Sequence, residues 1–118
     1  MEDYEMRALL GEFYDDTTEE QKDAIGEGCD ILDRRFPDSD MGDFRHEALA
    51  AMLAVIYGDD TDTARVSAWK AAKVAEVEAH AAMTGAIIGA ALTGDESEVA
   101  QAARLGVTRV TLRKALGR

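Results

Sequence analysis

The chain has 118 residues, a length typical of one domain or of a helical body with a small appended module. Its formal net charge is -11. Hydrophobic residues make up 47% of the chain, and this content excludes a disordered tail. The start MEDYEMRALL lacks the apolar run of a signal peptide, charged residues interrupt the long alanine-rich stretch, and the single cysteine, Cys29, excludes an internal disulfide. We therefore expect a folded, soluble, cytoplasmic protein in which Cys29 is a buried, reduced thiol.

Helical periodicity extends along most of the sequence and strand alternation is absent, so we predict an all-α fold of about six helices. In this fold an acidic N-terminal helical bundle (residues 1–62) precedes a long helix and a C-terminal helix-turn-helix (residues 63–118). The first helix is expected from Asp3 to Tyr14. Its apolar side is expected to carry Tyr4, Leu9, Leu10 and Phe13.

A capping-box pattern, Thr17 or Thr18 followed three residues later by Glu20 or Gln21, predicts the start of a second helix, which Pro37 ends. Its apolar positions are Ile25, Cys29, Leu32 and Phe36. Two glycines at positions 26 and 28 interrupt this pattern, which indicates a local kink or a close helix contact.

A third helix is expected to follow the turn at residues 37–40 and to end at Gly58. Its apolar residues are Phe44, Leu49, Met52, Leu53, Ile56 and Tyr57. Residues 59–62 form a linker and helix cap that contains three aspartates. Because the glycine and the distant glutamate of an EF-hand are absent, we predict no metal site there.

From Thr63 to about Leu92 the pattern predicts one long helix, or two helices that join near Thr84 and Gly85. Residues at near-heptad spacing form a stripe along it: Val66, Trp69, Lys73 or Val74, Val77, Ala81, Thr84, Ile88 and Ala91. Alanines and glycines make one side of this helix small, so that another helix can approach closely. That helix could belong to a second copy or to the N-terminal region of the same chain.

The segment SEVAQAARLGVTRVTLRKAL, residues 97–116, has the pattern of two short helices separated by a turn at residues 105–107. Asp95, with Glu98 three residues later, predicts the start of the first of these helices. Its inward residues are expected to be Val99, Ala102 and Ala103. Gly106 tolerates a positive φ at the bend, and Thr108 is expected to cap the second helix.

These residues resemble the helix-turn-helix of phage Cro-type and repressor-type regulators and of related bacterial DNA-binding proteins, over about twenty residues. In this resemblance Ala102 occupies the small position of the first helix, Gly106 the turn glycine and Val107 the apolar position after it. Leu112 and Leu116 occupy the two apolar positions that seat the recognition helix.

The resemblance implies that the exposed N-terminal part of the recognition helix, residues 108–117, enters the major groove of double-stranded DNA. Residues expected to reach base edges are Thr108, Arg109, Val110 and Arg113, since arginine suits the O6 and N7 atoms of guanine. Residues expected to meet phosphates are Lys114, Arg118 and Arg104.

Residues 97–118 contain five Lys or Arg and one Glu, a net of +4, which leaves -15 on the rest of the chain. We therefore predict a bipolar, homodimeric, sequence-specific DNA-binding transcriptional regulator. The alternative is a helical protein-interaction module, such as an antirepressor, an adaptor or a DNA mimic, that binds a protein partner through its acidic N-terminal region.

Signals of catalysis are lacking in the sequence. His46 and His80 are far apart, there is no cysteine pair, and there is neither a glycine-rich phosphate loop nor a nucleophile elbow. We therefore expect no enzymatic activity, no cofactor and no bound metal.

Overall fold

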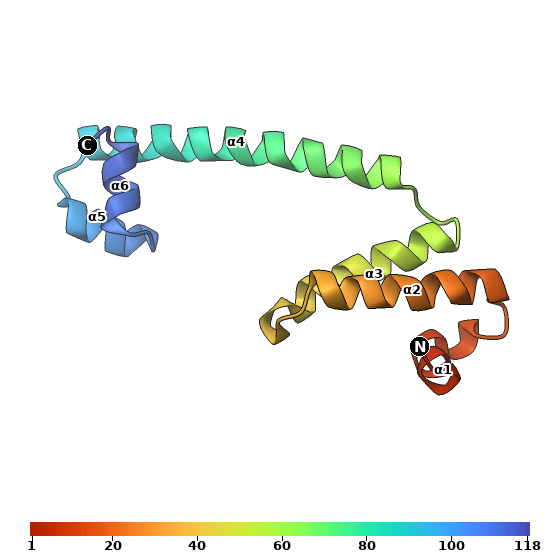
Figure 1. Cartoon of the computed structure of the whole chain (residues 1–118). Helices are drawn as coiled ribbons and strands as arrows, with labels where there is room; N and C mark the ends of the chain where they lie inside the picture. Colours follow the sequence, from red (N-terminus) through yellow and green to blue (C-terminus); the bar gives the residue numbers. More distant parts are fainter. The chain divides into compact units, whose positions relative to one another are not determined.

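The computed structural model describes residues 1–118 and contains helices, turns and loops but no strand, which confirms the all-α prediction. The chain forms two compact units, Met1–Val66 and Ser67–Arg118 (Figure 1). The elements in chain order are α1 (Asp3–Leu10), the 3-10 helix η1 (Gly11–Phe13), α2 (Glu19–Arg35), the 3-10 helix η2 (Ser39–Met41), α3 (Gly42–Ile56), α4 (Asp62–Thr93), α5 (Glu98–Leu105) and α6 (Arg109–Ala115). None of these helices has both the length and the apolar composition needed to cross a membrane.

Helix α2 starts with the predicted capping box. The Thr18 hydroxyl accepts a hydrogen bond from the Gln21 backbone N–H at 3.1 Å, and the Gln21 side chain accepts one from the Thr18 N–H at 3.0 Å. The helix ends at Arg35, two residues before Pro37. Proline disfavours a helical conformation in the residue before it, which accounts for the end of α2.

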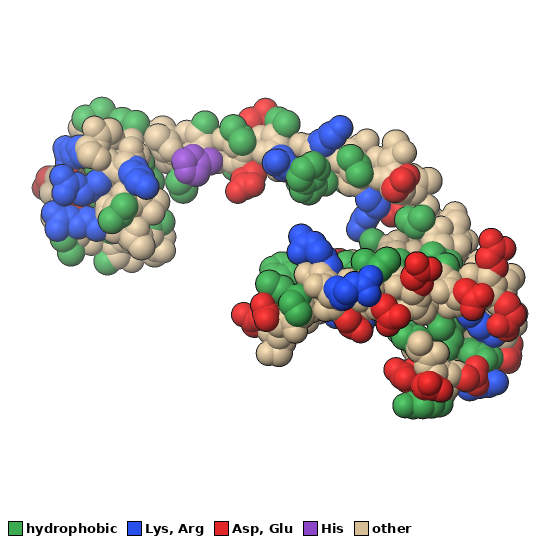
Figure 2. Space-filling model, viewed as in Figure 1, with side chains coloured by type: hydrophobic (Ala, Val, Ile, Leu, Met, Phe, Trp, Pro, Cys, Tyr) green, Lys and Arg blue, Asp and Glu red, His purple; other side chains and the backbone are tan.

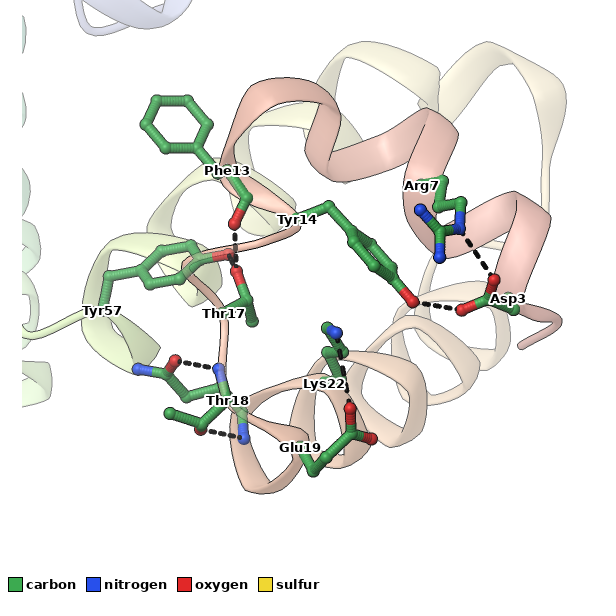
Figure 3. Close-up of polar contacts among 10 residues, drawn as sticks. Asp3, Arg7, Phe13, Tyr14, Thr17, Thr18, Glu19, Lys22 and Tyr57 are labelled. Atoms are coloured by element: carbon green, nitrogen blue, oxygen red, sulfur yellow. Dashed lines mark hydrogen bonds and ion pairs between the residues drawn. The ribbon is translucent and has the colours of Figure 1, made fainter.

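The first unit closes around α2, which packs against α3. Its buried core consists of Met6, Leu10, Ile25 and Cys29. The buried Thr17 hydroxyl donates to the Phe13 carbonyl at 2.7 Å and lies 2.8 Å from the Tyr57 hydroxyl (Figure 3). Because the one hydroxyl proton of Thr17 is used on Phe13, Tyr57 is the donor to Thr17. The bond to Phe13 holds the loop before α2 to η1, and the bond from Tyr57 connects it to the end of α3.

Gly28, one of the two glycines inside α2, lies at a close contact with α3. A Cβ at this position would overlap the sulfur of Met52 on α3, so the absence of a side chain is what allows this contact. The close helix contact, one of the two alternatives that the sequence left open, is therefore present at Gly28.

Three aromatic residues expected on apolar faces are exposed instead: Tyr4, Phe13 and Phe44. The first helix ends at Leu10 rather than at Tyr14, because Gly11 takes a positive φ of 54° and the chain continues as η1. Phe13 is therefore not at the α-helical spacing from Leu9 and Leu10 that predicted its burial. Tyr4 and Phe44 lie on the sides of α1 and α3 opposite to those that cover the core.

Helix α4 is continuous, not divided near Thr84 and Gly85. The Thr61 hydroxyl accepts a hydrogen bond from the Ala64 N–H at 3.1 Å at its start, and the Thr84 hydroxyl donates to the His80 carbonyl at 3.1 Å within it. Its residues from Ser67 onward belong to the second unit.

The start of α5 corrects the sequence prediction. Ser97, not Asp95, is its N-cap, and the Ser97 hydroxyl accepts a hydrogen bond from the Ala100 N–H at 3.1 Å. Val99 is 61% exposed and Ala103 is also exposed, because the buried side of this short helix is formed by residues 101 and 102.

The turn after α5 depends on a left-handed glycine. Gly106 has φ 69° and ψ 28°, and its N–H donates to the Ala103 carbonyl at 3.3 Å. The Val107 N–H donates to the Ala102 carbonyl at 3.1 Å, which completes a Schellman motif. This local geometry ends α5 and turns the chain toward α6.

We predict that Gly106→Ala destabilises the second unit by about 1 kcal/mol, because an L-residue is strained at a positive φ. The matched control is Gly89→Ala in the interior of α4. A Cβ there meets no atom within 4 Å, so this substitution is expected to stabilise the helix by about 1 kcal/mol. Urea unfolding followed by circular dichroism, with hydrogen exchange of residues 98–116, measures both effects. A more stable Gly106→Ala variant would contradict the left-handed turn.

Candidate nucleic-acid interface

Helix α6 is positioned by its cap and by one fully buried side chain. The Thr108 hydroxyl accepts a hydrogen bond from the Thr111 N–H at 3.1 Å, so α6 begins at Arg109. Leu112, one turn into the helix, is 0% exposed and packs with Ile87 of α4 and Ala102 of α5. Residues packed around this cluster are Met83, Val107, Ala115 and Leu116.

The five residues assigned to the motif framework therefore lie at one place in the second unit. Ala102 and Leu112 are in its core, Val107 and Leu116 flank the core, and Gly106 forms the bend. The inner face of α5 also contains a residue that the sequence did not indicate: Gln101, which is 3% exposed. Its side-chain amide donates to the Ile87 carbonyl at 3.4 Å, and this contact satisfies a buried polar group that is ordinarily exposed.

The opposite face of α6 is open. Val110 is 63% exposed, and the side chains of Arg109 and Arg113 are 60% and 50% exposed. Lys and Arg side chains gather over α5 and α6 (Figure 2). Three of the residues expected at base edges thus lie on the side of α6 that does not contribute to the core, and the fourth, Thr108, is the N-cap that precedes the helix.

Three of the predicted DNA-contacting arginines converge on one carboxylate. Glu98, the first residue of α5, pairs with Arg118, and its Oε2 atom lies 3.5 Å from the Arg109 Nε and 3.9 Å from the Arg113 Nε. The Arg118 guanidinium, with the charges of Arg113 and Arg109, holds the pKa of Glu98 below its usual range, although partial desolvation acts in the opposite direction.

The fourth arginine is paired as well. The Arg104 Nη2 atom lies 3.0 Å from the Glu96 Oε1 atom. Glu96 lies just outside the +4 segment, and with Asp95 it lowers the net charge of residues 95–118 to +2. Among the predicted contact residues, Lys114 is therefore the one cation that forms no ion pair.

The sequence did not reveal these pairs, because they join residues eight to twenty positions apart, and the pairs of Glu98 also cross the turn at Gly106. The only available signal was the presence of the two glutamates at the start of α5. Charge also differs sharply between the two units. Met1–Val66 contains six Lys or Arg and nineteen Asp or Glu, a net of -13, whereas Ser67–Arg118 has a net of +2.

The structure contains no group of three or more His, Cys, Asp or Glu side chains that could hold a metal ion. His46 and His80 are both exposed and belong to different units. Comparison with known proteins gives no match to a family model, to a curated protein or to a solved structure.

We predict that Glu98→Gln destabilises the α5–α6 region at neutral pH and that this effect disappears in acid. The pKa of Glu98 is lowered in the folded chain, so its contribution is fully present above the ordinary carboxyl pKa of about 4.3. It is lost as the pH falls through the lowered value in the folded state. Urea unfolding at pH 7 and pH 3, with Glu76→Gln as a control for an exposed glutamate outside any ion pair, measures the difference. An effect of Glu98→Gln that is independent of pH would contradict the assignment.

Proposed function

We propose that the chain is a sequence-specific DNA-binding transcriptional regulator in which α5 and α6 form a helix-turn-helix and α6 is the recognition helix. The observation that carries the proposal is the two-sided character of α6. Its inner side is seated by the fully buried Leu112, while the exposed Arg109 and Val110 project from its first turn and the exposed Arg113 from its last turn. A recognition helix needs both properties, since it must be held firmly while its side chains reach base edges.

The roles of the side chains follow from their chemistry. Arg109 and Arg113 carry the planar donor groups that pair with guanine, and Val110 offers an apolar contact for a thymine methyl group. Thr108 lies at the start of the helix, where a hydroxyl can meet either a base or a phosphate. The remaining cations, Lys114, Arg118 and Arg104, are assigned to phosphates.

DNA binding in this form is an exchange of partners. Arg109, Arg113 and Arg118 must leave Glu98, and Arg104 must leave Glu96, before their guanidinium groups can contact DNA fully. Each new contact with DNA replaces an existing ion pair. One copy therefore gains less binding free energy from these four arginines than it would if they were unpaired. With about three to five phosphate contacts, the slope of log K against log salt is expected to be about -3 to -4.5.

We predict that Arg109→Ala and Arg113→Ala each weaken binding to a selected DNA site by about 1 to 3 kcal/mol and reduce discrimination between sites. Lys114→Ala should weaken binding to all sequences equally and reduce the salt slope by about 0.9. Selection of sites from random duplexes, followed by salt-titrated anisotropy, measures these effects.

The control for charge removal is Arg34→Ala, which removes an exposed arginine from α2 that forms no ion pair. It should leave the binding constant and the salt slope unchanged. Glu98→Gln tests the exchange directly, because removal of the competing carboxylate should strengthen binding. Equal affinity of Arg109→Ala, Arg113→Ala and the original chain would overturn the recognition-helix assignment.

A protein-interaction role is the second candidate. It is favoured by the first unit, where a net charge of -13 surrounds exposed aromatic residues. These aromatic residues are Tyr4 (72% exposed), Phe13 (60%) and Phe44 (66%). In this role the acidic unit binds a basic protein and acts as an antirepressor, an adaptor or a DNA mimic. Absence of DNA binding even at low salt, together with capture of a basic partner that Phe13→Ala and Phe44→Ala weaken, would favour this role.

A further inference from the structure

Helix α4 carries an exposed apolar face within the second unit. Val74 is 59% exposed, Val77 is 69% exposed and Ile88 is 36% exposed. Residues at alternating intervals of three and four form the line Val74, Val77, Ala81, Thr84, Ile88 and Ala91, which we call the α4 seam. This spacing is the heptad pattern of a coiled coil, with positions 74, 81 and 88 as a and positions 77, 84 and 91 as d.

The α4 seam is centred on a different side of the helix from the face that seats α5 and α6, and the two faces meet at Thr84, which lines a hollow with Thr111 and Ala115 of α6. The second face includes Ile87, which is in the core of the unit, and Met83, which packs against that core. At 100° per residue, its centre lies roughly 120° around the helix from the centre of the seam. A further helix centred on the seam therefore approaches α4 from a different side than α5 and α6 do.

We propose that the α4 seam binds a second copy of itself, in register and in parallel, as a short two-stranded coiled coil. Val74 and Ile88 are β-branched residues at a positions, as in two-stranded parallel dimers, while the d positions are smaller than the leucine of that class. The alanines and the threonine allow a close approach but bury little apolar area, so they add little free energy to the dimer. Self-association of this kind does not depend on DNA binding.

The charges that flank the seam select the orientation. Lys73 occupies a g position and Glu78 the e position five residues later. In a parallel dimer, a g residue faces the e residue of the following heptad on the other helix, so two Lys73–Glu78 pairs form by symmetry. An antiparallel dimer instead places g beside g and e beside e, so it forms no Lys73–Glu78 pair between the helices.

The same charges identify the occupant. A seam flanked by one lysine and one glutamate is complementary to a second copy of itself. A partner surface that carries charges of only one sign would place a like charge beside either Lys73 or Glu78. The first unit has a net charge of -13, so its helices would suit Lys73 but repel Glu78. Charge complementarity therefore favours a second copy over the first unit.

The parallel arrangement adds a geometric consequence to the proposed function. Because α5 and α6 follow the C-terminal end of α4, both copies of α6 lie at the same end of the paired helices. Two recognition helices related by a two-fold axis read a palindromic site.

Charge reversal tests the pairing in the full chain without DNA, by sedimentation equilibrium. Lys73→Glu and Glu78→Lys each convert two attractive pairs into repulsive ones and should raise the dimer dissociation constant about tenfold. The double variant Lys73→Glu/Glu78→Lys should restore it. Circular dichroism of each monomer accounts for effects on the helix itself. A double variant as weak as the single variants, or a chain that is monomeric at all concentrations, would overturn the proposal.

Cysteine cross-linking tests the register and the orientation. Val77→Cys places a thiol at a d position, where two in-register parallel copies bring the sulfur atoms together, and oxidation by glutathione disulfide should yield a covalent dimer. The control Ala79→Cys lies at an outward f position and should not cross-link. Native Cys29 is 3% exposed, and burial raises the pKa of its thiol, so the original chain should also remain uncross-linked. A dimer in solution without a Val77→Cys disulfide would overturn the parallel orientation.

Discussion

The second unit depends on the contact that Leu112 makes with Ile87 and Ala102. Helices α5 and α6 have eight and seven residues, well below the roughly 12 to 15 that an isolated helix needs in water. Their helical state is therefore a consequence of packing on α4, which at 32 residues is long enough to provide the support. Local capping by Ser97 and Thr108 sets where the two helices begin, but burial of Leu112 is what makes them persist.

The features that the sequence predicted well are those that short-range chemistry determines. The capping box of α2, the cap at Thr108 and the left-handed glycine at 106 each depend on residues within about four positions. The errors concern which side of a helix is buried, because that depends on contacts with other helices: Tyr4, Phe44 and Val99 were expected on buried sides and are exposed. In α5 the buried residues are Gln101 and Ala102, because the packing of this helix against Ile87 of α4, not the position of its cap, decides which residues face inward.

The candidate site was predictable as a set of residues but not as an electrostatic arrangement. Sequence spacing identified the outward side of α6, because Leu112 fixes its inward side. The convergence of three arginines on Glu98 requires the bend at Gly106 and the packed core, neither of which charge counting contains. Under the proposed function these pairs matter for specificity. Base contacts by Arg109 and Arg113 and phosphate contacts by Arg104 and Arg118 all displace a carboxylate, so phosphate contacts alone bind weakly, and a site that also provides base contacts is needed to offset the lost ion pairs.

The charges of the chain affect self-association through α4 and DNA binding through α6 in opposite ways. Each chain has a net charge of -11, so two copies repel one another at long range even though the α4 seam attracts at short range. Salt screens the long-range repulsion more than it weakens the two close Lys73–Glu78 pairs. Self-association is therefore expected to strengthen as the salt concentration rises. The affinity of α6 for DNA is expected to fall as the salt concentration rises, because binding releases counterions from the duplex. The regulator proposed here thus has two associations with opposite responses to ionic strength. Intermediate salt, where the copies are paired and the arginines still reach DNA, is the condition in which a palindromic site is read best.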